Sequence, residues 1–217
     1  GDPRYLLPYI QACINHFGPD MENHASYYKN GKTYKFQEHS HNFSVNIGDI
    51  TEGLQTLITS KIIPNLDDIN HILNNGGTLL DFGCGTGNLL LKASNIYKTA
   101  IFYGLDIDKN GLETANKSIV SLGKKNKITF FDGNGPVQPK ENSIDVITMV
   151  EVFHEIDKKI REKVLKDLFK ILKPNGTLII LDETMPEKSN LRDQAGLLAI
   201  LTQYNEMTWG NEVPTLK

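Results

Sequence analysis

The sequence has little of several features that would place it in a specialised class of protein. No apolar run approaches the roughly 20 residues that a membrane-spanning helix needs, and no secretory signal is visible. Two cysteines, Cys13 and Cys84, make no disulfide framework, so we expect a cytoplasmic protein without a membrane partner. The net charge of −3 provides no overall basic field for phosphates, so we expect no nucleic-acid partner.

The composition and length are typical of a globular protein. The apolar fraction of 39% and the charged fraction of 23% are ordinary values. A length of 217 residues fits one domain with a full core, with or without a short extension. Composition alone therefore leaves the function open, and the motifs must supply it.

The most informative stretch covers residues 78–91, which read TLLDFGCGTGNLLL. It starts as an apolar run that is too short for a helix, breaks at Gly83-Cys84-Gly85-Thr86-Gly87, and resumes as a helix start. A strand, a glycine turn and a helix in this order bring bare backbone and a helix N-terminus close to a ligand.

The spacing of the glycines narrows the ligand class. Dinucleotide folds usually carry G-x-G-x-x-G, whereas here the third glycine comes one residue earlier. Asp106 ends the next apolar run, 23 residues after Gly83, where a carboxylate can accept hydrogen bonds from both ribose hydroxyls. The pattern indicates a nucleoside site without clear provision for a pyrophosphate.

Residues 81–87 together with Gly104-Leu105-Asp106 resemble the cofactor signature of class I S-adenosylmethionine-dependent methyltransferases. The alternative is a glycine turn in some other α/β protein. The resemblance implies S-adenosyl-L-methionine as cofactor. The residues that it places at the cofactor are Asp81, Gly83, Cys84, Gly85, Gly87, Asp106, Ile107, Asp132, Gly133 and Glu151.

Asp132 and Gly133 follow the third expected strand. In the family that this chain resembles, an acidic or amide residue at this point binds the adenine amino group, and the glycine leaves space for the ring. The alternative is a simple Asp-Gly turn.

The order of the expected elements predicts the fold class. Strands are expected at 78–82, 101–106, 127–131, 144–150 and 176–182, and helices at 87–97, 109–122, 157–172 and 190–205. This alternation predicts an α/β fold with a parallel, Rossmann-like sheet and helices on both faces. The resemblance implies two further strands, which residues 206–217 cannot supply; we expect a C-terminally incomplete fragment, the alternative being a sheet one hairpin short.

The first part of the chain has a different character. We expect a helix at 4–17 that Gly18-Pro19 ends, a loop-rich lid at 18–48, and helices at 51–63, opening at a possible N-cap Thr51, and 66–73. Residues 1–77 would then be a helical connector and lid, and residues 78–217 the cofactor-binding domain. The first segment loosely resembles the connector of two-domain methyltransferases, whose N-terminal winged helix is absent here and usually forms the dimer. A homodimer through that domain is therefore expected.

The candidate catalytic residue is His154, in the string VFHEIDKKIREKVLKDLFKILKPNGTLIILDE. This string resembles small-molecule O-methyltransferases, in which the histidine is the general base that deprotonates an acceptor hydroxyl. The alternative is a histidine that caps a helix or fills the pocket wall. Glu155 and Asp157 are expected at a helix start, and Glu151 at the cofactor.

Other chemistries have less support in the sequence. No N-P-P-Y or D-P-P-Y tetrapeptide follows the fourth strand, which argues against methylation of amino groups on nucleic acid bases, and no cysteine nucleophile stands there. His39 and His41 lie two residues apart, but a metal site needs three or four ligands, so we expect no metal.

The sequence thus predicts methyl transfer from S-adenosylmethionine to a small molecule, most simply to a hydroxyl oxygen. Nitrogen or carbon acceptors remain alternatives, as do a non-catalytic module that binds S-adenosylmethionine or its demethylated product and a nicotinamide oxidoreductase. The acceptor, the oligomeric state and any substrate contact of His39, His41 or Glu155 cannot be derived from the sequence.

Overall fold

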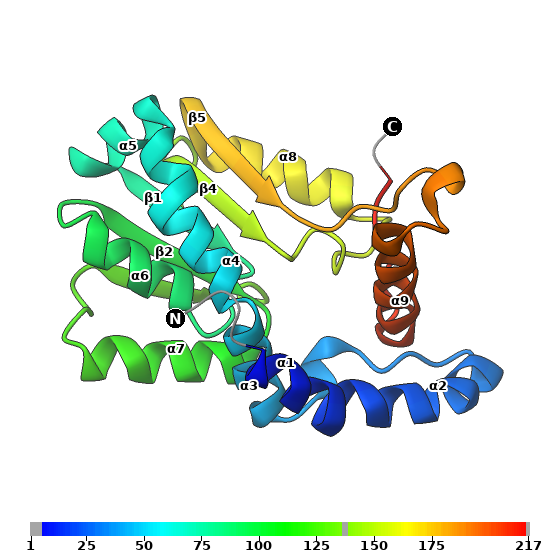
Figure 1. Ribbon diagram of the computed structural model, residues 1–217. Coiled ribbons are helices and arrows are strands. Elements are labelled where there is room, and N and C mark those ends of the chain that lie inside the picture. Colours follow the sequence, from blue (N-terminus) through cyan, green and yellow to red (C-terminus); the bar gives the residue numbers. More distant parts are fainter. Residues whose placement is uncertain (1–5, 136–138, 216–217) are drawn as a thin grey trace.

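A computed structural model describes residues 6–135 and 139–215 (Figure 1). Its centre is a parallel sheet in the order β3-β2-β1-β4-β5, in which β1 lies between β2 and β4. The strands are β1 (Thr78–Phe82), β2 (Ile101–Asp106), β3 (Ile128–Asp132), β4 (Ile144–Val150) and β5 (Leu172–Leu181). This confirms the predicted fold class, and β5 starts four residues earlier than expected.

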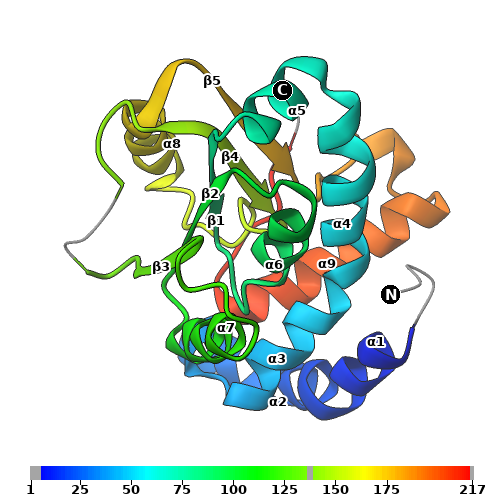
Figure 2. The ribbon, with the colours of Figure 1, turned by 90° about the vertical axis from the view of Figure 1, so that its left-hand side faces the viewer.

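Helices cover both faces of the sheet, with α4, α5 and α6 on one side and α8 on the other (Figure 2). Neighbouring residues of one strand serve opposite faces: Leu79 belongs to the core on the α6 side and Leu80 to the core on the α8 side, and both are fully buried. The covering helices are α4 (Glu52–Leu57), α5 (Asp67–Asn74), α6 (Asn88–Ile96), α7 (Lys109–Ser121) and α8 (Arg161–Ile171).

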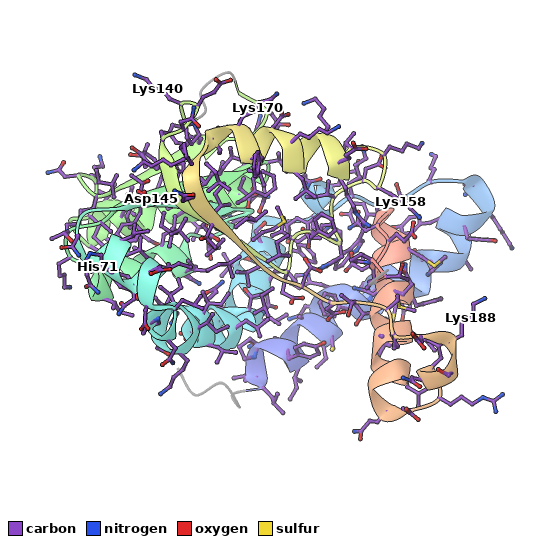
Figure 3. The ribbon with its side chains drawn as sticks, turned by 90° about the horizontal axis from the view of Figure 1, so that it is seen from above. His71, Lys140, Asp145, Lys158, Lys170 and Lys188 are labelled. Atoms are coloured by element: carbon purple, nitrogen blue, oxygen red, sulfur yellow. The ribbon has the colours of Figure 1, made fainter. Side chains whose placement is uncertain are left out.

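A polar clamp ties three strands together at the amino end of the sheet. One carboxylate oxygen of Asp145 on β4 accepts hydrogen bonds from the Thr78 N–H at 2.8 Å, the Thr78 hydroxyl at 2.9 Å and Lys173 Nζ at 2.7 Å. Burial alone would raise the pKa of Asp145, but these partners hold it below its usual range. Figure 3 shows Asp145 at the end of the sheet that lies away from α9.

The remaining helices form a separate layer beside the carboxyl ends of the strands (Figure 1). This helical layer consists of α1 (Leu7–Ala12), α2 (Gly18–Asn30), α3 (His41–Ile50) and α9 (Gln194–Trp209). α9 packs against α2, although the two are far apart in the sequence. Residues from both ends of the described chain therefore share one helical unit.

Two local predictions about the first 50 residues are wrong. Gly18 and Pro19 do not end a helix: a π turn at Cys13–Phe17 leads directly into α2. In a π turn each N–H bonds to the carbonyl five residues earlier, instead of four as in an α-helix. The turn lies just before Pro19, which has no N–H to donate. The stretch 18–48 is mostly helical rather than loop-rich.

Smaller corrections concern helix starts. Thr51 does not cap α4 with its side chain; its hydroxyl donates to the Ile47 carbonyl at 3.0 Å instead. Glu155 and Asp157 precede α8, which begins only at Arg161.

The core of the helical layer is aromatic and polar. Phe43 is fully buried, and its ring stacks on His39 with centroids 4.0 Å apart. Trp209 is 5% exposed and meets Phe17, Phe36 and Phe43 with ring centroids 5.5–6.2 Å apart. Across residues 6–135 and 139–215, no helix is both long and apolar enough to cross a membrane.

Candidate functional site

The glycine turn between β1 and α6 has the backbone that only glycine adopts readily. Gly83, Gly85 and Gly87 have φ angles of 75°, 49° and 76°, in the left-handed region. A Cβ on Gly83 would lie 2.3 Å from Val152 Cγ2, so the missing side chain lets the turn after β4 approach. Beside Gly85, no described atom lies within 4 Å of a Cβ position, which leaves open space on the turn.

Asp106 faces this turn from the end of β2. Its Oδ2 accepts a hydrogen bond from the Gly85 N–H at 2.6 Å, and its Oδ1 accepts one from the Asp108 N–H at 2.7 Å. Burial raises its pKa, and the two backbone donors oppose that rise. A carboxylate accepts about four hydrogen bonds. Each oxygen therefore keeps the capacity to receive one hydroxyl of a diol.

Asp132 and Gly133 lie next to Asp106 at the end of β3, where Asp106 and Asp132 are in register. The Asp132 carboxylate accepts from the Asn134 N–H at 2.8 Å, as in an Asx turn. The Gly133 N–H donates to the Asp106 carbonyl at 2.7 Å, and a Cβ there would lie 3.0 Å from Ile107 Cγ2. Ile107 itself is 45% exposed, which provides an apolar surface beside the two carboxylates.

Asp81 and Cys84 lie beneath the turn rather than on its open side. Asp81 is 4% exposed and accepts a hydrogen bond from the Thr148 hydroxyl at 2.7 Å. Burial raises the pKa of Asp81 to about 7. Cys84 is 5% exposed, and its Sγ fills the place that a Cβ on Gly104 would need. Burial also raises the pKa of this thiol, which makes it a packing group and not a nucleophile.

Glu151 follows β4 in a conformation that is unusual for its residue type. Its φ is +55°, and its N–H donates to the Leu181 carbonyl of β5 at 2.8 Å. Burial, with the nearby charge of Asp182, raises the pKa of Glu151 to about 7. A strained backbone and a desolvated carboxyl group are typical of functional positions.

His154 is 5% exposed and lies between carboxylates from two distant elements. Its Nδ1 is 2.7 Å from Asp182 Oδ1, just after β5, and its Nε2 is 3.8 Å from Glu206 Oε1 on α9. The other oxygen of Asp182 accepts the backbone N–H of Phe153 at 2.6 Å and that of Val152 at 3.1 Å. Asp182 thus fixes both the ring and the turn that carries it.

The charges around His154 decide its protonation. Burial alone would lower its pKa, but the hydrogen bond to Asp182 and the charges of Glu155 and Glu206 raise it to about 9. The same environment raises the pKa of Glu155 well above its ordinary value, chiefly by burial, and raises that of Glu206. In the free chain the ring is an imidazolium, and Nε2 faces Glu206 at more than hydrogen-bond distance.

Sequence reasoning missed two of these groups. Asp182 and Glu206 are 28 and 52 residues from His154 in the sequence, so no local pattern links them. The carboxyl ends of parallel strands meet at one edge of a sheet, which offered a hint for Asp182 alone. His39 and His41 lie in the helical layer, where Asp20 and Thr114 are their partners.

The residues present fit a nucleoside cofactor. The open space beside Gly85, the remaining acceptor capacity of Asp106 and the exposed Ile107 lie at the ends of neighbouring strands. Ligands of such sheets bind in the crevice outside the carboxyl ends of the strands, and these residues lie at that edge, after β1 and at the end of β2. Within the described part of the chain, no group of three or more His, Cys, Asp or Glu side chains is arranged to hold a metal ion.

Comparison with known sequences agrees with this geometry. Residues 80–178 match the family described as Methyltransferase domain. The chain is 31% identical over 143 residues to the demethylmenaquinone methyltransferase of Lactococcus lactis, covering 65% of this chain and 52% of that protein. It is 29% identical over 113 residues to a ubiquinone/menaquinone biosynthesis C-methyltransferase of Salmonella arizonae, covering 51% and 44%. The chain thus spans about half the length of these relatives.

The fold also matches a solved structure over most of the described chain. An O-methyltransferase family protein from Burkholderia thailandensis superimposes with a TM-score of 0.65 at 17% identity, covering 93% of this chain and 64% of that one. At this identity the likeness shows the fold alone. Residues 80–178 therefore match a methyltransferase domain in sequence, and the described chain matches an O-methyltransferase family protein in fold.

Proposed function

We propose that this protein transfers the methyl group of S-adenosylmethionine to a hydroxyl oxygen of a small molecule, with His154 as general base. The observation that carries the proposal is the position of His154, held by Asp182 at 2.7 Å in the turn that packs against the glycine loop. When bound, S-adenosylmethionine supplies a methyl group on a sulfonium centre. The protein's own residues hold the reactants and accept the proton.

The cofactor is held by the residues at the strand ends. Asp106 would receive the ribose hydroxyls, Ile107 and Gly133 would line the adenine ring, and Asp132 would accept from its amino group. The glycine turn with Gly83, Gly85 and Gly87 admits the rest of the molecule close to the backbone, and Asp81 and Cys84 support that turn from below. Glu151 faces the cofactor from the end of β4.

The proton transfer follows from the position of His154. Asp182 accepts from Nδ1–H, so that Nε2 is the atom free to take a proton from the acceptor hydroxyl. The ring must first become neutral, and a cationic ligand in the crevice favours this because like charges lower a histidine pKa. Positioning of two reactants contributes about 7–11 kcal/mol of barrier lowering, and a general base adds roughly 10²- to 10⁴-fold in rate.

The helical layer supports a lid role for the first segment. Gly48 of α3 lies so close to the glycine turn that a Cβ there would be 2.5 Å from Thr86 Oγ1. α9 brings Glu206 to the same crevice from the other end of the described chain. We therefore propose residues 1–77 as the connector and lid of the acceptor site. The net charge of −3 favours a small molecule over nucleic acid as the acceptor.

A carbon acceptor is the second candidate. The observation that favours it is the name of the Salmonella arizonae relative, a C-methyltransferase. The base chemistry is compatible with it, because deprotonating a phenol also activates its ring carbons. A non-catalytic module would keep the same cofactor residues but would have no need of a carboxylate-held histidine in the turn.

The deciding experiment uses S-adenosylmethionine with a labelled methyl group and a panel of phenols, hydroquinones and hydroxy acids. We expect transfer to oxygen, identified by mass spectrometry and NMR of the product. His154→Ala should lower the rate by roughly 10²- to 10⁴-fold with cofactor affinity nearly unchanged.

His71→Ala is the matched control, because His71 is exposed on α5 at the opposite end of the molecule (Figure 3). Full activity of His154→Ala would show that His154 is not the general base. Methylated carbon in the product would replace the oxygen assignment by the second candidate.

A further inference from the structure

α9 connects the candidate site with the core of the helical layer. Glu206, near its end, lies 3.8 Å from His154 Nε2 and is 4% exposed. Trp209 follows three residues later, within the same turn of helix, and enters the aromatic core. The orientation of this last turn therefore determines both the distance from Glu206 to His154 and the packing of Trp209.

Trp209 is held there by a directional hydrogen bond as well as by packing. Its indole N–H donates to Asp20 Oδ2 at 3.0 Å, and the same oxygen lies 2.9 Å from His39 Nε2. Asp20 is 6% exposed and His39 9%. One buried carboxylate on α2 thus joins α9 to the turn that precedes α3.

His39 is oriented from both sides of its ring. Nε2 faces Asp20, and Nδ1 lies 3.0 Å from the Phe36 carbonyl and 3.1 Å from that of Lys35. Asp20 and His39 therefore form a buried pair whose orientation is fixed from both sides of the ring.

A buried polar pair is a poor source of net stability. Removing polar groups from water costs free energy, and apolar residues of similar volume often stabilise a core equally well. The surrounding Tyr34, Phe36 and Phe43 could supply such packing. What a buried pair with fixed hydrogen bonds adds is a single geometry.

The segment that carries His39 is itself fixed to the cofactor side of the molecule. The Asn110 amide on α7 lies 3.5 Å from the His39 carbonyl, and Thr114 Oγ1 lies 3.3 Å from His41 Nε2. Gly48 of α3 then touches Thr86 of the glycine turn. The Asp20–His39 pair is therefore connected, through α3 and α7, to the glycine turn.

We propose that Asp20 and His39 are positioning residues: they fix the last turn of α9 through Trp209 and thereby hold Glu206 opposite His154. The importance of this position rests on the proposed function, in which His154 is the base. The geometry itself is open to test without any methyl acceptor.

The test uses Trp209, the only tryptophan of the sequence, as a reporter. Asp20→Asn and His39→Gln should raise acrylamide quenching of its fluorescence roughly twofold or more, because a loosened helix end exposes the ring. In the same variants, NMR titration should show the pKa of His154 falling from about 9 toward its ordinary 6.5, since Glu206 moves away. The His154 signal is assigned with His154→Gln.

Two further variants separate the steps. Glu206→Gln should lower the pKa of His154 while leaving Trp209 quenching unchanged. Tyr28→Phe, on the exposed side of the same helix as Asp20, should change neither readout. If Asp20→Asn and His39→Gln do not fold, Trp209→Phe keeps the ring packing, removes only the indole N–H and should still lower the pKa of His154.

The proposal is overturned if folded Asp20→Asn and His39→Gln match the unmodified protein in both quenching and His154 titration. It is equally overturned if Trp209→Phe leaves the pKa of His154 at about 9. Failure of the proposed function would look different, because it would show as an absence of methyl transfer by the unmodified protein with both readouts as expected.

Discussion

The sheet and the helical layer are held together by different means. The sheet buries aliphatic side chains on both faces, such as Leu79 and Leu80 at 0% exposure. The helical layer buries rings and polar groups, with Asp20, His39 and Trp209 joined by hydrogen bonds. Aliphatic burial is strong but non-directional, whereas hydrogen bonds specify angles. The difference indicates that the sheet supplies stability and the layer supplies orientation.

The largest expected effect tests this difference with two phenylalanines that are both 0% exposed, Phe102 on β2 and Phe43 on α3. Phe102→Ala should lower the free energy of unfolding of the whole chain by about 3–5 kcal/mol. Phe43→Ala should chiefly speed amide exchange within residues 7–50 and 194–209, with the sheet amides still protected. If each variant sped amide exchange equally in the sheet and in the helical layer, the two regions would not differ in the way proposed.

The next effect concerns the junction of the two regions, at His154. The pKa of His154 in the folded chain is about 9, above the ordinary 6.5. Protonation of His154 therefore stabilises the folded state fully below pH 6.5, and this contribution is lost as the pH rises through 9. The shift corresponds to on the order of 3 kcal/mol. Urea unfolding of the unmodified protein and His154→Gln should differ by this amount at pH 6 and converge near pH 10. A difference that does not depend on pH would contradict the raised pKa.

A smaller effect separates binding from folding among the polar groups at the strand ends. Asp106→Ala should weaken S-adenosylmethionine binding by about 1–3 kcal/mol, as for the loss of charge-assisted hydrogen bonds. Burial raises the pKa of Asp106, so the cost of desolvating the carboxylate offsets the two backbone hydrogen bonds that it accepts, and its removal should change stability less than binding. Calorimetry measures the affinity for S-adenosylmethionine, and urea unfolding measures the stability. Asp68→Ala on α5 is the control. Unchanged affinity would remove Asp106 from the cofactor site.

The smallest effect is expected on the surface of α8. Lys166 pairs with Glu162 at 2.6 Å, but both side chains are largely exposed. Lys166→Ala should change the free energy of unfolding by less than about 0.5 kcal/mol, because water and salt screen such pairs. A larger loss in urea unfolding would mean that surface charge contributes to the stability attributed here to aliphatic burial.

The same contrast explains what the sequence could predict. The strands and helices from residue 78 onward follow apolar runs and helical periodicity, which is how Asp106 and the glycines of the turn could be placed together. Residues 18–48 mix rings, histidines and asparagines without a clear period, so α2 and α3 were not predicted, whereas the helix expected at 4–17 contains α1. Their core depends on partners such as Asp20 and Trp209, which are 189 residues apart.

The candidate site shows a similar division. Local motifs predicted His154 and the residues of the glycine turn as candidates. They could not predict that Asp182 would hold the ring or that Glu206 would face it from α9. They also gave no sign that Asp81 and Cys84 lie beneath the turn, because burial depends on the strands at either side.

The Asp145 clamp has a consequence for how such a protein can diversify. It secures β1, β4 and β5 to one another at the rim of the sheet farthest from the crevice. Because strand alignment is anchored there, replacements at the opposite rim need not shift one strand past another. New acceptor preferences can therefore arise along α9 without rebuilding the scaffold beneath it.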